Sequence, residues 1–73
     1  MATLETLASK LAEDTIAAMA ETGEDRLFVE VGTLLAASSQ SLEEAYLTEV
    51  RIRLAARAAQ EFLDRKRASA RSG

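Results

Sequence analysis

The chain has 73 residues, of which 48% are hydrophobic and 29% charged, and its formal net charge is −3. This length allows one domain at most, and the absence of Cys and His excludes disulfides and the usual zinc sites. The sequence is too apolar for an intrinsically disordered chain, and its many Ala and Leu residues without any Pro favour helices. Because so small a core is only marginally stable, we expect added stability from oligomerisation or a partner.

The sequence gives no sign of a membrane segment or an export signal. No stretch approaches the roughly 20 apolar residues of a membrane span, and the N-terminal residues lack the basic start and unbroken apolar run of a signal peptide. The absence of Cys is compatible with a reducing compartment. We therefore expect a cytoplasmic protein of bacterial type without membrane contacts.

The first predicted element is an amphipathic helix over about residues 3–21. Its narrow apolar seam recurs at spacings of four and three and comprises Leu4, Ala8, Leu11, Thr15 and Ala18. Thr3 is suited to cap the start, and Gly23 is suited to end the helix in a left-handed conformation.

The second element, over about residues 24–38, is predicted as a helix because Leu27, Val31 and Leu35 share one helical face. The β-branched residues within 27–33 weaken helix propensity and leave a strand open as the alternative. Gly32 has two readings: it permits close approach of another helix, or it is simply tolerated within a short helix.

The third element is predicted as a long helix over about residues 42–67. Ser41 and Glu44 have the S-x-x-E spacing of a capping box at its start. Its roughly 26 residues would span about 39 Å. Residues 1–67 would thus form a single helical domain, followed by a disordered tail over 68–73.

The third helix is predicted to have apolar side chains on two sides, so that it needs two neighbours. In a monomer, the two shorter helices could cover one side each. In a symmetric dimer, which we favour, the third helices pack on each other and the shorter helices cover the outer side. The fold predicted is therefore an all-α three-helix arrangement, dimerised into a helical bundle. The predicted residues of the oligomer or partner interface are Leu47, Val50, Ile52, Leu54, Ala55, Ala59, Phe62 and Leu63. Tyr46, the only Tyr, is predicted either to close the end of the bundle or to anchor the interface.

The residue types argue against catalysis. Without His or Cys the commonest general bases, nucleophiles and metal ligands are missing, and no phosphate-binding glycine motif is present. A helical domain of this size also has little volume for a pocket that would shift the pKa of a carboxylate or Lys. We expect no enzyme activity, no cofactor and no metal.

Charge is distributed unevenly along the chain. Residues 1–45 carry nine acidic and two basic side chains, a net −7, whereas residues 46–73 carry three acidic and seven basic ones, a net +4. The basic residues of the C-terminal segment that suit contact with nucleic acid are Arg65, Lys66, Arg67 and Arg71. The acidic character of the whole chain and the lack of interleaved aromatic residues favour a solvated helix end instead.

These features together predict a small, non-catalytic interaction protein: a regulator, adaptor or assembly factor that works as a homodimer or on an unknown protein partner. The alternative is a nucleic-acid-associated regulator that uses the basic segment. A further possibility is that the acidic and basic halves of two copies meet head to tail.

Overall fold

The computed structural model describes the backbone of residues 2–72 and the side chains of residues 2–71. Within this range the chain forms three α-helices, α1 (Leu4–Thr22), α2 (Leu27–Ser38) and α3 (Gln40–Ser72), and no strand. The predicted all-α three-helix fold is confirmed, and the segment 27–33, for which a strand had remained open, is helical.

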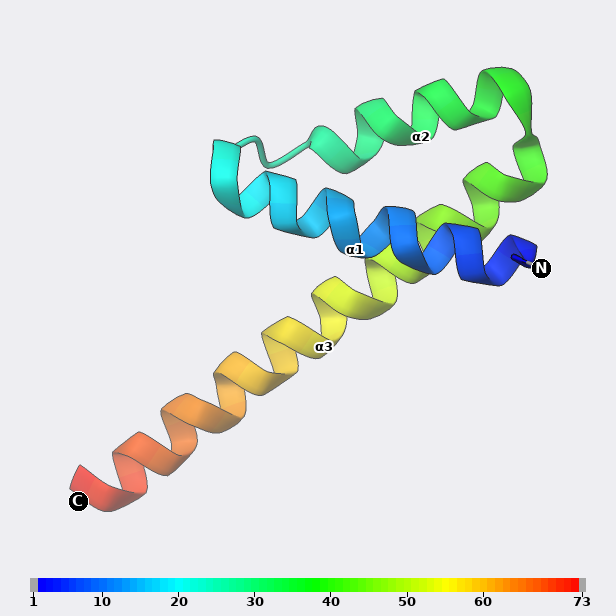
Figure 1. Ribbon diagram of the computed structural model, residues 1–73. Coiled ribbons are helices and arrows are strands. Elements are labelled where there is room, and N and C mark those ends of the chain that lie inside the picture. Colours follow the sequence, from blue (N-terminus) through cyan, green and yellow to red (C-terminus); the bar gives the residue numbers. More distant parts are fainter. Residues whose placement is uncertain (1, 73) are drawn as a thin grey trace.

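The molecule is elongated because α3 extends well past the other two helices. α1 and α2 lie against its first half, and its second half projects away from them (Figure 1). The radius of gyration is 15.3 Å, whereas a compact domain of this length would have about 11 Å. The 33 residues of α3 span about 50 Å, close to the longest dimension of 53 Å.

Both ends of α1 follow the predicted signals. The Thr3 hydroxyl accepts a hydrogen bond from the Thr6 backbone N–H at 3.1 Å, which satisfies one of the free donors at the helix start. Gly23 adopts φ 76°, and its N–H donates to the Met19 carbonyl. That left-handed conformation is one that only Gly adopts without a steric penalty.

A single residue, Ser39, joins α2 to α3, and the capping box predicted at Ser41 and Glu44 is wrong. Its N–H donates to the Leu35 carbonyl at the end of α2, and its hydroxyl accepts from the Leu42 N–H at 3.1 Å. The cap of α3 is therefore Ser39 rather than Ser41, and Glu44 is not its capping-box partner. The link is this short because one residue satisfies free backbone groups of both helices, with its backbone N–H at the end of α2 and its hydroxyl at the start of α3.

The core lies where α1 crosses the first half of α3. Its fully buried members are Ala8 and Ala12 from α1 and Tyr46 and Val50 from α3. The small Ala side chains allow the large Tyr46 ring to pack close to the α1 backbone. Tyr46 thus lies in the centre of the core of one chain, not at a bundle end or an interface with another molecule.

The polar end of Tyr46 is satisfied inside this core. Its hydroxyl donates to Thr15 Oγ1 at 3.0 Å, and the Thr15 hydroxyl donates in turn to the Leu11 carbonyl at 2.7 Å. Thr15, part of the seam predicted for the first helix, is only 6% exposed. Burial raises the pKa of Tyr46 above its ordinary value, because the phenolate form would lose its hydration.

The last helical turns continue beyond the predicted boundary. α3 ends at Ser72 rather than near residue 67, so the tail expected to be disordered is helical over residues 68–72. The physical reason is that Ala and Arg in this segment are good helix formers and no Pro or Gly interrupts the helix before its end. Gly73, the last residue of the predicted tail, lies outside the described residues.

Candidate interaction surface

The eight residues predicted for the interface divide into two groups. Val50 is fully buried, and Leu47 and Leu54 are partly buried against the same core. These three side chains pack within one chain and are covered by α1 and α2. Five of the eight residues therefore remain for contact with another molecule.

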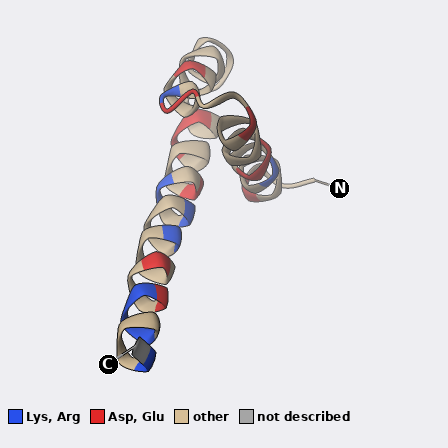
Figure 2. Cartoon of the chain, turned by 90° about the vertical axis from the view of Figure 1, so that its left-hand side faces the viewer, with Lys and Arg blue, Asp and Glu red and all other residues tan. Residues whose placement is uncertain are grey.

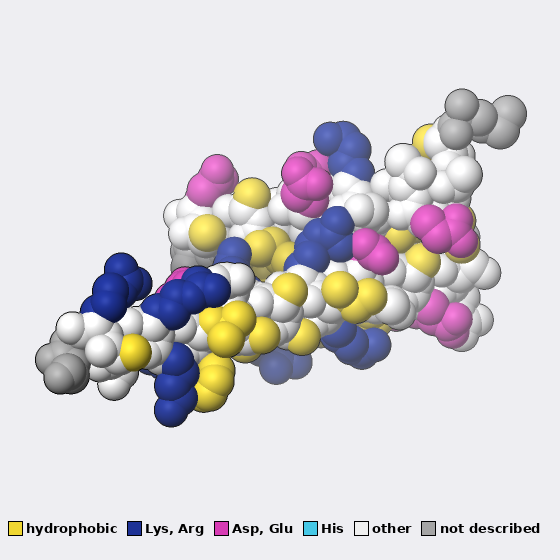
Figure 3. Space-filling view, turned by 90° about the horizontal axis from the view of Figure 1, so that it is seen from below, with side chains coloured by type: hydrophobic (Ala, Val, Ile, Leu, Met, Phe, Trp, Pro, Cys, Tyr) yellow, Lys and Arg dark blue, Asp and Glu magenta, His cyan; other side chains and the backbone are white. Residues whose placement is uncertain are grey.

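Those five residues are exposed and belong to one apolar surface. The large side chains Ile52, Phe62 and Leu63 are 56%, 51% and 46% exposed, respectively. Together with the exposed Ala side chains between them they form what we call the α3 stripe: Ile52, Ala55, Ala56, Ala59, Phe62 and Leu63. Seen along the length of α3, hydrophobic side chains form a nearly continuous band (Figure 3).

The α3 stripe faces away from α1 and α2. At about 100° per residue, Val50 lies within about 40° of Tyr46 on the helix, whereas Ala55 lies about 180° and Ala59 about 140° from it. Since Tyr46 and Val50 point into the core, the middle of the stripe lies on the opposite side of the same helix, and its edge at Leu63 lies about 100° from Tyr46.

The projecting half of α3 has a polar strip on the side that continues from the core. Gln60 Nε2 donates to Asp64 Oδ1 at 3.0 Å, and Arg67 pairs with Asp64 at 3.6 Å. Arg57 lies on the same side of the helix, about 20° from Tyr46. The second half of α3 is therefore amphipathic in its own right, with the apolar side turned outward.

Arg53 on α3 contacts α1 instead of lying free in solvent. The Arg53 guanidinium donates to Ser9 Oγ at 2.6 Å and pairs with the Glu49 carboxylate at 2.5 Å. Both charged side chains are 30% exposed. This bridge is a further polar contact between α1 and α3, in addition to the buried hydrogen bond of Tyr46 to Thr15. Ser9 as a contact was missed, because one polar residue beside an apolar seam carries no sequence signal of its own.

The basic residues gather at the free end of α3, as Figure 2 shows. Arg65, Lys66, Arg67 and Arg71 are all exposed, but three of them contact their own helix. The Lys66 ammonium lies 5.5 Å from the centre of the Phe62 ring, and Arg71 Nε donates to the Arg67 carbonyl at 3.4 Å. The exposed bases give this end a positive surface that extends up to the α3 stripe.

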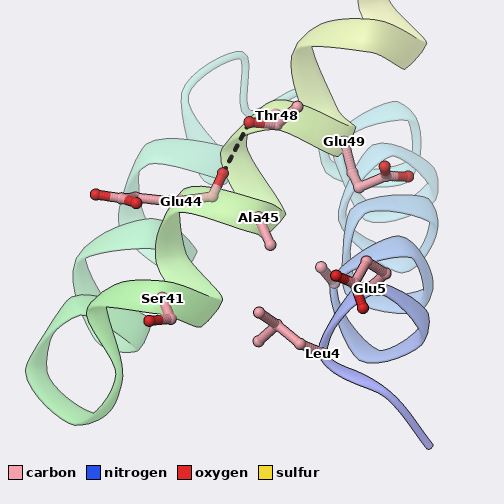
Figure 4. A pocket seen from close by; sticks show the side chains of 8 residues that line it. Leu4, Glu5, Ser41, Glu44, Ala45, Thr48 and Glu49 are labelled. Carbon is pink, nitrogen blue, oxygen red and sulfur yellow. Dashed lines mark hydrogen bonds between the residues drawn. The ribbon is translucent and has the colours of Figure 1, made fainter.

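A shallow depression of about 390 Å³ lies between the starts of α1 and α3 (Figure 4). Three carboxylates line it, those of Glu5, Glu44 and Glu49. The Glu44 side chain points away from Glu5, so the acidic groups do not converge on a common point. In residues 2–72, no three side chains of metal-ligating type lie close enough to hold an ion together.

Comparison of the chain with protein-family models, with curated proteins and with solved structures finds no match. Over the described residues, no helix is both long and apolar enough to cross a membrane. The candidate function therefore rests on this chain's own surfaces. The α3 stripe contains all the exposed large hydrophobic side chains of α3.

Proposed function

We propose that the protein is a small, non-catalytic interaction protein that acts through the outward face of α3, primarily by homodimerisation. The observation that carries the proposal is the α3 stripe, in which three large apolar side chains are each about half exposed on a helix that extends beyond its own domain. Monomeric proteins seldom leave contiguous apolar surface of this kind in water without an interaction that uses it.

The role that fits such a surface is that of a regulator, adaptor or assembly factor in a bacterial-type cytoplasm. The chain has neither His nor Cys, which fits a role by contact rather than by chemistry. A rigid helix that presents one apolar side is a common way for one helical protein to bind another. The same face can also accept a helix of a different protein.

Sedimentation equilibrium from micromolar to millimolar concentration tests the proposal. We expect the wild-type chain to shift from monomer to dimer, and Leu63→Lys, on the stripe, to shift this equilibrium strongly towards monomer. Ala68→Lys is the matched control, because it adds the same charge at an exposed position about 140° around α3 from Leu63, outside the α3 stripe. A wild-type chain that stays monomeric throughout, with a cooperative thermal transition, would overturn the proposal.

A second candidate function is binding of nucleic acid by the basic end of α3. It is supported by four exposed bases within residues 65–71, a segment that holds no acidic residue. Titration with duplex DNA and RNA at several salt concentrations tests it, because phosphate contacts make affinity fall steeply with salt. Replacing Arg65, Lys66 and Arg67 together by Ala should abolish such binding while the helical circular dichroism signal persists. Absence of binding at low salt would exclude this function.

A further inference from the structure

We propose that two copies pair antiparallel through the α3 stripe, with Ile52 of each copy facing Leu63 of the other. This inference rests on the proposed homodimerisation and adds its orientation and register. The occupant of the outward face of α3 would thus be the same face of a second chain.

Charge complementarity determines the orientation. Residues 40–50 of α3 carry three acids, Glu43, Glu44 and Glu49, and no base, whereas residues 65–71 carry four bases and no acid. Antiparallel packing places the acidic start of each helix beside the basic end of the other. Parallel packing would place four bases beside four bases and three acids beside three acids, which is unfavourable at a helix spacing of about 8–10 Å. At physiological salt the Debye length is also about 8 Å, so such neighbours are only partly screened.

The apolar residues determine the register. Facing Ile52 with Leu63 pairs the large side chains at the two ends of the stripe and leaves Ala56 opposite Ala59 at its centre. Small side chains at the centre allow the two helix backbones to approach closely. Glu49 and Arg67 are separated by five full helical turns, so they lie on the same flank of α3 beside the stripe, where each also pairs with a neighbour on its own helix. In a twofold antiparallel pair, each flank of one copy meets the same flank of the second copy. Glu49 of each copy would therefore lie nearly level with Arg67 of the other along the helix axis.

The size of the contact predicts a reversible dimer. In this register about 30 residues of each α3 overlap, which makes a strip about 45 Å long and about 10 Å wide. The footprint is on the order of 450 Å² per copy and 900 Å² for both, in the range of weak, transient interfaces. We therefore expect a monomer–dimer equilibrium in which the monomer is folded.

Spin labels on single cysteines test the orientation, since the native chain contains no Cys. Ser69→Cys and Ala58→Cys are both exposed positions on α3. In the antiparallel register two labels at position 69 are about 35 Å apart along the helix axis, whereas two labels at 58 are nearly level. In a parallel dimer the labels would be level at both positions.

Electron paramagnetic resonance distances at dimer-forming concentration give three distinct outcomes. A long distance at position 69 with a short one at 58 supports the antiparallel register. Short distances at both positions overturn it and leave homodimerisation intact. If neither position shows dipolar coupling, the chain is monomeric, and both the proposed function and this inference are wrong.

Discussion

Removal of the Tyr46 hydroxyl is a direct test of how the core is built. In Tyr46→Phe the ring keeps its packing, but the hydrogen bond to Thr15 Oγ1, 3.0 Å long and fully buried, is lost. Thr15 still donates to the Leu11 carbonyl, so no donor is left without an acceptor. The free energy of unfolding should therefore fall by about 1 kcal/mol, the net value of one such bond. Urea denaturation followed by circular dichroism, at a concentration where the chain is monomeric, measures this.

Thr15→Val provides the complementary perturbation. It preserves side-chain shape but leaves the Tyr46 O–H buried without an acceptor, so it should cost about 1–3 kcal/mol, more than Tyr46→Phe. In the double variant the unpaired hydroxyl is gone, and the combined loss should be smaller than the sum of the two single losses. Additive losses, or a Tyr46→Phe variant as stable as wild type, would refute the buried hydrogen bond.

Two further predictions concern backbone and pH. Gly32→Ala should stabilise the fold by about 0.5–1 kcal/mol, because Ala is the better helix former and its Cβ would meet Leu47 Cδ2 at 3.4 Å, an ordinary contact. Gly23→Ala should instead cost about 1–2 kcal/mol, because the residue has φ 76°. Denaturation midpoints that reversed these signs would contradict the helix packing. Because burial raises the folded-state pKa of Tyr46 above 10.0, the native chain holds the phenol proton more tightly than the unfolded one. Its contribution to stability should be complete below about pH 10 and lost as the pH rises towards the folded-state pKa. Tyr46→Phe should lack this alkaline loss, and tyrosinate absorbance should report it directly, since Tyr46 is the only Tyr.

Much of the fold was predictable because local signals were unambiguous. Thr3 and Gly23 mark the ends of α1, and the apolar residues of the first two segments recur at the spacing of one helical face. The start of α3 was not predictable to the residue, because three Ser residues lie close together within 38–41 and each can cap a helix. In the structure Ser39 is the extended residue between α2 and α3, and its hydroxyl caps α3.

The candidate surface was predictable only in part. The helical wheel correctly placed Ile52, Ala55, Ala59 and Leu63 on one side, but it could not tell which side of α3 the other helices cover. That choice depends on the buried pairing of Tyr46 with Thr15 across 31 residues of sequence. A Thr within an apolar seam needs a partner for its hydroxyl, and the single Tyr was a candidate for this role that sequence reasoning did not use.

The central claim is that the outward face of the projecting half of α3 is covered by a second copy. Hydrogen exchange of the backbone amides of residues 55–71, measured over a range of protein concentrations, tests this most directly. All of these residues are exposed in the single chain, and their amides should exchange readily because little packing holds this part of the helix. We predict that their protection rises with concentration, whereas amides next to Ala8 and Ala12 in α1 keep a constant protection. Exchange of residues 55–71 that does not depend on concentration would contradict the account.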